Sequence, residues 1–237
     1  MPQQRSRQPE IGIPEEVAAI NKEIRVFMDT LDADGNKIGS TKYGVYAFFD
    51  YEEEPIYVGQ TEESLRQRVG RHLTNQRTDA VAMSVLDPFE VAYIEVWPLP
   101  HLATHEKASI NKALNSAEFS VFQKVLSASA LGAVLNEKDI TSTDLIVLPT
   151  SYRARIVPDG IFEARNHPDI RIARRAGTIA RLAQVISERN VSLGLRRTLV
   201  TQAKRLERLA SQRFVEFTKA GVQIDHESAG EETGETS

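Results

Sequence analysis

Apolar residues recur every three or four positions near the start of the chain, which places them on one face of a predicted helix. These positions are Val17, Ile20, Ile24, Phe27 and Leu31. Pro14, followed by two glutamates, is typical of a helix start, because proline suits the first helical position and acidic groups favour that end of the helix dipole. Residues 32–36 then predict a turn. An EF-hand is not expected, since Lys37 and Tyr43 replace its glycine and glutamate.

Three segments have the composition of strands. The aromatic runs 43–49 and 55–59 flank an acidic stretch at 50–54, which predicts two antiparallel strands joined by a loop. Residues 89–97 alternate between apolar and polar and are bounded by prolines, which favours a third strand. A helix is expected after Thr61. The fold class is therefore α/β (α+β), with a small antiparallel three-stranded sheet flanked by helices.

The second half of the chain predicts mostly helices. Helices are expected at 102–115 and 117–130, and a Ser/Thr-rich stretch up to residue 151 predicts a domain boundary. Two long amphipathic patterns at about 169–190 and 192–220 predict a C-terminal helical hairpin. We expect four regions: an N-terminal extension with one helix (1–42), a domain that contains the three strands (43–140), a basic helical domain (151–222) and an acidic disordered tail (223–237).

Composition narrows the classes of protein. The 237 residues include no cysteine, which excludes disulfides, thiolate zinc sites and cysteine nucleophiles. No run approaches the roughly 18 apolar residues of a membrane span, and the first residues lack the apolar core of a signal peptide. We therefore expect a cytoplasmic protein with no membrane partner.

The net charge of −4 conceals a strong asymmetry. Residues 1–150 hold 14 basic and 22 acidic side chains, residues 151–224 hold 15 and 6, and the last 13 residues hold 0 and 5. A basic module attached to an acidic domain suggests contact with nucleic acid or another polyanion. Solvated arginine faces on a helical hairpin are an equally good explanation of the charge alone.

Common enzyme signatures are absent from the sequence: there is no Walker loop, nucleophile elbow, dinucleotide fingerprint or kinase set. His101 and His105 are four residues apart, but Leu102 stands where a zincin carries its glutamate, so we do not expect a metal site there.

Two tripeptides carry the informative pattern. Gly44-Val-Tyr46 lies on the first predicted strand and Tyr57-Val-Gly59 on the second, with ten residues between them, and Arg68 and His72 follow on the next helix. This combination resembles the GIY-YIG nuclease family over about residues 43–136. The resemblance implies a phosphodiester-hydrolysing site built from these four side chains.

The chemistry of the four side chains agrees with that implication. A tyrosine can relay a proton from water if an imidazole such as His72 eases its ionisation. The guanidinium of Arg68 can bind two phosphate oxygens at once. Helical spacing puts Arg68 and His72 on one face, while Arg66 and Arg71 point elsewhere and are expected at a nucleic-acid-facing rim.

The family also uses a glutamate to hold a divalent cation, Mg²⁺ or Mn²⁺. Glu118 and Glu106 are the candidates, and the apolar residues after Glu118 favour it, with 101–116 as an insertion. Asn136 resembles the asparagine near the end of the family domain, where it positions active-site backbone or contacts phosphate; an ordinary turn residue is an equally good explanation. Gln60 is a departure, since many members carry a basic residue there.

The C-terminal helices supply a second set of candidates. Arg174 and Arg181 on the first helix, beside Arg171 and Arg175, fall largely on one side of its apolar stripe. Residues Leu195 to Phe217 of the second helix contain its buried stripe, and its basic positions are Arg197, Lys204 and Arg208. We expect these basic residues to contact DNA backbone, including single-stranded or structured DNA. Homodimerisation through these helices is an alternative role.

The resemblance thus implies a metal-dependent DNA endonuclease. A nuclease fold that binds nucleic acid without cutting it is the alternative.

Overall fold

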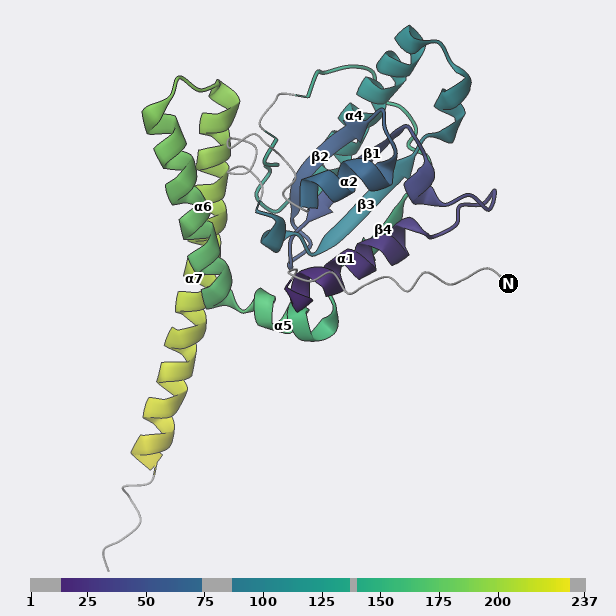
Figure 1. The fold of residues 1–237 in the computed structure, drawn as a ribbon. Helices are drawn as coiled ribbons and strands as arrows, with labels where there is room; N and C mark the ends of the chain where they lie inside the picture. Colours follow the sequence, from purple (N-terminus) through teal and green to yellow (C-terminus); the bar gives the residue numbers. More distant parts are fainter. Residues whose placement is uncertain (1–13, 74–86, 137–139, 231–237) are drawn as a thin grey trace, which may run out of the picture.

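The computed structural model describes residues 14–73, 87–136 and 140–230, with side chains up to residue 219. Its N-terminal half is a mixed α/β domain and its C-terminal half is a helical hairpin beside it (Figure 1). Helix α1 (Glu15–Met28) occupies the predicted segment, and Asp32 Oδ1 accepts the backbone N–H groups of Asp34 and Asn36 in the predicted turn. No cluster of three potential metal-ligating side chains occurs among the described residues.

The sheet has four antiparallel strands in the order β2-β1-β3-β4. They are β1 (Gly44–Phe49), β2 (Pro55–Thr61), β3 (Tyr93–Pro98) and β4 (Tyr152–Arg155). The expectation of three strands was therefore wrong. Strand β4 has only four residues, in which exposed arginines alternate with half-buried side chains. So short and polar a segment does not predict a strand from sequence alone. Residues 152–157, which were expected to open the basic helical domain, instead belong to this sheet and its core, because β4 pairs with β3 and Ile156 and Val157 are buried.

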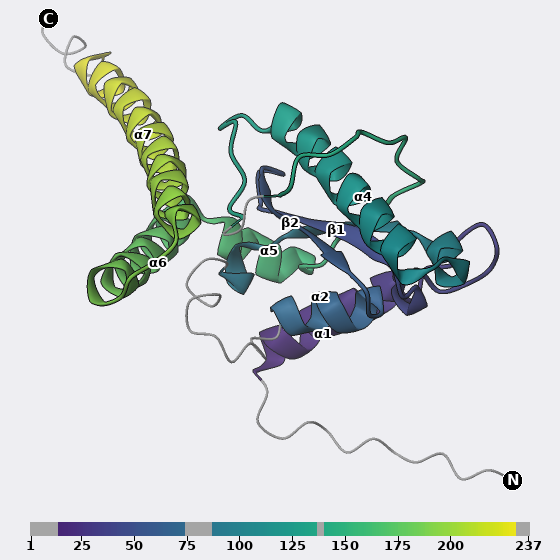
Figure 2. The ribbon, with the colours of Figure 1, turned by 90° about the horizontal axis from the view of Figure 1, so that it is seen from above.

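Helices cover both faces of the sheet (Figure 2). Tyr46, Phe48 and Val96 face α1 and α2 (Leu65–Leu73), whereas Val45, Ala47 and Val58 face α4 (Lys107–Ala128). Every residue of the central strand β1 is buried. Successive residues of a strand point to opposite faces, and here both faces are covered by helices. A shift of the strand pairing by one residue would therefore exchange the two buried sets of side chains, so the pairing that holds the candidate site is fixed.

Helix α4 replaces the two helices expected at 102–115 and 117–130. The 3-10 helix η3 (Pro100–Thr104) precedes it, and η1 (Ile38–Ser40) and η2 (Pro88–Glu90) lead into β1 and β3. Ser116 lies at the expected break between the two helices, but its carbonyl accepts from the hydroxyl of Ser120 within the continuous helix. That bond satisfies the buried serine without interrupting the turn.

The hairpin consists of α6 (Pro168–Glu188) and α7 (Leu193–Gly230), and α7 extends well beyond α6 (Figure 1). Helix α7 reaches further than expected, so residues 223–230 of the expected disordered tail are helical; residues 231–237 lie outside the described part. A short helix, α5 (Asp159–Asn166), precedes α6, although the sequences Pro158-Asp-Gly160 and His167-Pro168 on either side of it are typical of a loop. Pro158 and His167 bound that helix rather than break it. No helix of the described residues is long and apolar enough to cross a membrane.

Candidate active site

Tyr46 is the centre of the candidate site. It lies on the buried central strand and has no exposed surface. Its Oη accepts a hydrogen bond from Arg68 Nε at 3.1 Å and lies 2.9 Å from His72 Nε2. The phenol oxygen is therefore held between a permanent cation and an imidazole, which are the two groups that can ease its ionisation.

Helix α2 supplies both partners of Tyr46. The Ser64 hydroxyl accepts the backbone N–H of Gln67 in the first turn of the helix, and Leu65 and Val69 anchor α2 in the core. With that face buried, the four-residue spacing directs Arg68 and His72 towards β1. The prediction that these two side chains share one face is confirmed by their common contact with Tyr46.

Gly59 lies opposite Tyr46 in the pairing of β1 with β2. A Cβ atom at this position would stand 2.6 Å from Tyr46 Oη and 2.9 Å from Tyr57 Cε1. Real Cβ atoms do not approach other atoms so closely, so a side chain here would displace the tyrosines. Gly59 is thus required by the close approach of the two rings rather than by a strand-end bend.

Tyr57 borders the site on β2 and is half-buried. Its ring centroid lies 6.1 Å from that of Tyr46 and 5.3 Å from that of His72. The second tyrosine therefore lies beside the first, at the more accessible side of the cluster.

Glu118 approaches from the other layer of the domain, on α4, and is partly buried. Burial raises the pKa of Glu118 to about 7, although the backbone N–H of Gln60 and the charge of Arg68 act to lower it. Burial also lowers the pKa of Arg68, but Tyr46, Tyr57 and Glu118 outweigh this effect and raise that pKa above its usual value. These mutual influences link Glu118 with Arg68 at the end of β2.

Glu106 does not share this position. It is the exposed N-cap residue of α4, twelve residues before Glu118, which corresponds to about 18 Å along the helix axis. The helix therefore separates the two candidates and favours Glu118. His101 lies on η3 and His105 is the residue that caps its end; His105 Nδ1 is 2.9 Å from the His101 carbonyl oxygen.

Glu118 is the carboxylate that lies closest in influence to Arg68 among the predicted metal ligands. Mg²⁺ is commonly bound by one or two carboxylates together with waters and phosphate oxygens, so a single carboxylate such as Glu118 fits such an ion. Next to it, an open pocket of about 400 Å³ is lined by residues 60–63 and Arg68. Its acidic rim is partly neutralised, because Glu62 pairs with Lys107 and Glu63 with Arg71.

Arg66 and Arg71, which were expected at a nucleic-acid-facing rim, are both bound to other residues of the chain. Arg66 Nη2 donates to the carbonyl of Met28 at 3.1 Å and to Asp29 Oδ1 at 2.6 Å, so Arg66 connects α2 to the end of α1 instead of facing outward. Arg71 is exposed and pairs with Glu63.

Asn136 is buried against the outer edge of β2. Its Nδ2 donates to the carbonyl of Val58 at 2.7 Å, and its Oδ1 accepts the Val58 N–H at 3.1 Å. The preceding residue, Leu135, donates its N–H to the carbonyl of Ile56 at 2.7 Å. This geometry supports the backbone-positioning role, because both ends of the side-chain amide are engaged by the backbone of Val58.

The basic residues of the hairpin divide into two groups. Arg181, Arg197 and Lys204 are exposed, Arg208 is half-buried, and Arg174 packs over the ring of Phe89. Arg171 and Arg175, expected on the same outward face as Arg174, are instead 1% and 4% exposed. The apolar stripe also differs from expectation at Phe217, which is 60% exposed.

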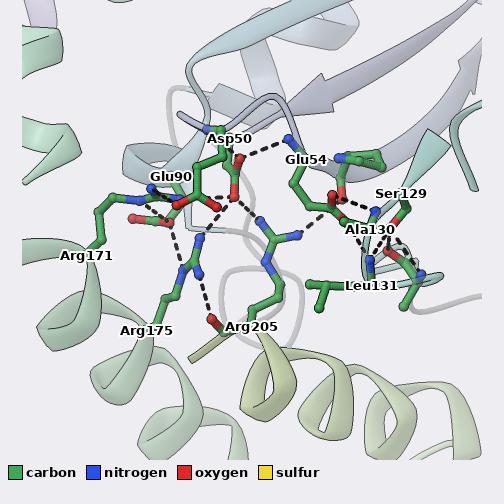
Figure 3. Close-up of polar contacts among 12 residues, drawn as sticks. Asp50, Glu54, Glu90, Ser129, Ala130, Leu131, Arg171, Arg175 and Arg205 are labelled. Atoms are coloured by element: carbon green, nitrogen blue, oxygen red, sulfur yellow. Dashed lines mark hydrogen bonds and ion pairs between the residues drawn. The ribbon is translucent and has the colours of Figure 1, made fainter. Parts of the chain in front are cut away.

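The buried arginines bind carboxylates of the catalytic domain (Figure 3). Arg171, Arg175 and Arg205 converge on Asp50, in the loop between β1 and β2, and Arg175 also binds Glu90. Sequence reasoning missed this set. The available signal was the acidic run at 50–54 in a chain with a strongly basic second half, which favours pairing within the molecule as well as contact with a polyanion.

Comparison with known families agrees with the geometry. Residues 42–117 match the family model of the GIY-YIG catalytic domain, a segment that contains Tyr46, Tyr57, Arg68 and His72 and ends immediately before Glu118. No curated protein and no solved structure matches the chain. The match covers about a third of the chain, and it shows that residues 42–117 are similar to the GIY-YIG catalytic domain.

Proposed function

We propose that the protein is a metal-dependent endonuclease that hydrolyses DNA phosphodiester bonds. The observation that carries this proposal is the position of Tyr46 Oη between Arg68 Nε and His72 Nε2, both within 3.1 Å. A phenol that merely packed in the core would not need a cation and an imidazole on the same oxygen.

In the proposed reaction, unprotonated His72 Nε2 accepts the proton of Tyr46 Oη. The hydrogen bond from Arg68 stabilises the resulting phenolate. The phenolate oxygen then accepts a proton from a water molecule as that water's oxygen bonds to phosphorus and the bond from phosphorus to the leaving oxygen breaks.

Arg68 has a second task in this scheme. Its Nε donates to Tyr46 Oη, and Arg68 also lines the pocket beside β2, where its terminal nitrogens would bind the non-bridging oxygens on which charge accumulates. Glu118 would hold Mg²⁺ or Mn²⁺. A bound divalent ion supplies a Lewis acid that stabilises the charge on the leaving oxygen.

Cleavage of supercoiled, linear and single-stranded DNA with and without Mg²⁺ tests the proposal. Arg68→Ala and Glu118→Ala should each lower the rate by at least about a hundredfold. Arg25→Ala is the matched control, since Arg25 is exposed on α1 and its Nε donates to the carbonyl of Asn21 in the same helix. Unchanged cleavage in purified Arg68→Ala protein would refute the assignment.

The same assay decides the alternative of a binding module. DNA binding that weakens with salt, together with no cleavage under Mg²⁺ or Mn²⁺, would favour a nuclease fold that only binds. An RNA substrate in parallel distinguishes the nucleic acid. Exposed Arg181, Arg197 and Lys204 are the proposed backbone contacts on the hairpin, with half-buried Arg208 and Arg174 beside them.

Association of two copies through α7 is a second proposal. It is supported by Phe214 and Phe217, which are 71% and 60% exposed and three residues apart on a helix, because exposed aromatic pairs commonly mark contact surfaces. Light scattering of the parent and of a Phe214→Ser, Phe217→Ser variant tests it. A monomeric parent would exclude this role.

A further inference from the structure

The acidic loop (residues 50–54), which joins β1 to β2, has each of its four carboxylates engaged by another part of the chain. Glu52 binds Arg171 at 3.0 Å and Glu53 binds Arg153 at 2.8 Å. Glu54 accepts the backbone N–H groups of Ala130 and Leu131. Such complete use is unusual for a surface hairpin loop, where acidic side chains are normally solvated.

Asp50 is the most heavily used of these side chains. It is 1% exposed, and its Oδ1 accepts the backbone N–H groups of Glu52 and Glu54 at 2.9 and 3.0 Å. Its Oδ2 accepts from three guanidinium groups of the hairpin: Arg171 at 3.1 Å, Arg175 at 2.9 Å and Arg205 at 2.6 Å (Figure 3). One carboxylate therefore shapes the loop with one oxygen and attaches the hairpin with the other.

Arg205 adds a direct contact with the next strand. Its Nη1 donates to the carbonyl of Pro55, the first residue of β2, at 3.2 Å. The carbonyl of Arg205 in turn accepts from Arg175 Nη1 at 2.7 Å. This bond joins α7 to α6 directly beside Asp50, so the arginines of the two helices are held together. Arg175 also binds Glu90, shortly before β3.

Glu54 attaches the same loop to the helix that carries Glu118. Its carboxylate accepts from the Ser129 hydroxyl and from the two N–H groups that follow, in the turn after α4 (Figure 3). The loop is therefore the meeting point of both tyrosine strands, the end of α4 and the hairpin.

These contacts lie a short way along rigid strands from the candidate site. Asp50 follows Tyr46 by four residues, or about 13 Å of extended strand, and Tyr57 follows Pro55 by two residues, or about 7 Å. A shift of the loop would therefore move the two strands relative to each other. Catalysis is sensitive to displacements of about 1 Å even when their origin is remote.

We propose that Asp50 and Arg205 are positioning residues that hold the strands of Tyr46 and Tyr57 against the C-terminal hairpin, so that the hairpin is part of the catalytic unit and not only a DNA-binding appendage. This inference rests on the proposed nuclease function. It predicts that the buried arginines of the hairpin affect kcat, whereas exposed basic residues of the hairpin would affect the affinity for DNA.

Arg205→Lys is the informative variant, because lysine keeps the charge but cannot reproduce the fork that contacts both Asp50 and Pro55. Arg213→Lys is the matched control: Arg213 also lies on α7 and binds a carboxylate with two nitrogens at 3.1 Å, but its partner is Asp169 on α6. We expect Arg205→Lys to lower kcat at least about tenfold per folded molecule with KM within twofold of the parent. Arg213→Lys should change neither constant by more than twofold.

Hydrogen exchange of the full-length protein tests the positioning without any reaction. Amides of residues 44–61 should exchange at least about tenfold faster in Arg205→Lys and at the parental rate in Arg213→Lys. Asp50→Asn, which retains an oxygen for the loop N–H groups, should behave as Arg205→Lys does if it folds. Parental exchange and parental kcat in folded Arg205→Lys, or a loss confined to KM, would overturn the inference. Absence of cleavage by the parent would instead overturn the proposed function, and exchange would still decide the positioning.

Discussion

Replacing Glu118 with glutamine should stabilise the metal-free protein at alkaline pH. The pKa of Glu118 is about 7 in the folded chain, against about 4.5 for a free glutamate. Because burial opposes the charged form, the folded protein binds an extra proton between these two pH values. The free energy of unfolding therefore falls as the pH rises from 4.5 through 7, and the fall is complete above pH 7.

The magnitude follows from the difference in pKa. A shift of roughly 2.5 units, at about 1.4 kcal/mol each, corresponds to about 3 kcal/mol of unfolding free energy. Glutamine has nearly the same shape and no charge. Glu118→Gln should thus be about 3 kcal/mol more stable than the parent at pH 8 and nearly equal to it at pH 4.5.

Urea unfolding in EDTA at several pH values measures this difference. Glu106→Gln is the control, since Glu106 is an exposed glutamate of the same helix and its substitution should change the unfolding free energy by less than about 0.5 kcal/mol at every pH. Equal stability of Glu118→Gln and the parent at pH 8 would refute the account of a buried, uncompensated carboxylate. With Mg²⁺ present the gap should narrow, because only the parent gains stability by binding the ion.

Three further outcomes follow from single contacts. Gly59→Ala should lower the cleavage rate at least about tenfold, since its Cβ would displace the Tyr46 hydroxyl; parental activity would show that the tyrosine can move without consequence. Asn136→Ala should reduce the unfolding free energy in urea by about 3 kcal/mol, because it leaves the buried N–H and carbonyl of Val58 without their side-chain partner; a loss below 1 kcal/mol would contradict the edge-pairing role. Lys204→Ala should reduce the slope of log affinity for duplex DNA against log salt by about 0.9, whereas a parental slope would remove this residue from the proposed DNA surface.

The elements nearest the site were predictable because their patterns are strong. Aromatic and apolar runs identify the first two strands, alternation of apolar and polar residues identifies the third, and period 3.6 identifies α1 and α2. Once β1 and β2 pair around a short loop, Tyr46 must lie near Gly59, and four-residue spacing must bring Arg68 and His72 together. Local rules therefore lead to most of the candidate site.

The buried arginines escaped prediction because their chemistry depends on a distant segment. On a helical wheel, Arg171 and Arg175 resemble a solvated face, since an arginine is normally buried only with a carboxylate partner. That partner, Asp50, lies about 120 residues earlier in the chain. Strand β4 escaped for a related reason: its four residues become a strand only because the edge of β3 is available to them.

The fourth strand and the arginine cluster bear on where this protein could be divided. The segment that matches the family ends at residue 117. The last strand of the sheet, however, is Tyr152–Arg155, and the loop between β1 and β2 is bound by arginines as far along the chain as Arg205. A fusion protein made from the family segment alone would expose a strand edge and a cluster of carboxylates without counter-ions. The shortest fragment that can fold by itself should therefore extend from α1 to at least Leu209 on α7. An exchange of segments with a related protein inside that interval would have to replace the acidic loop and the hairpin together.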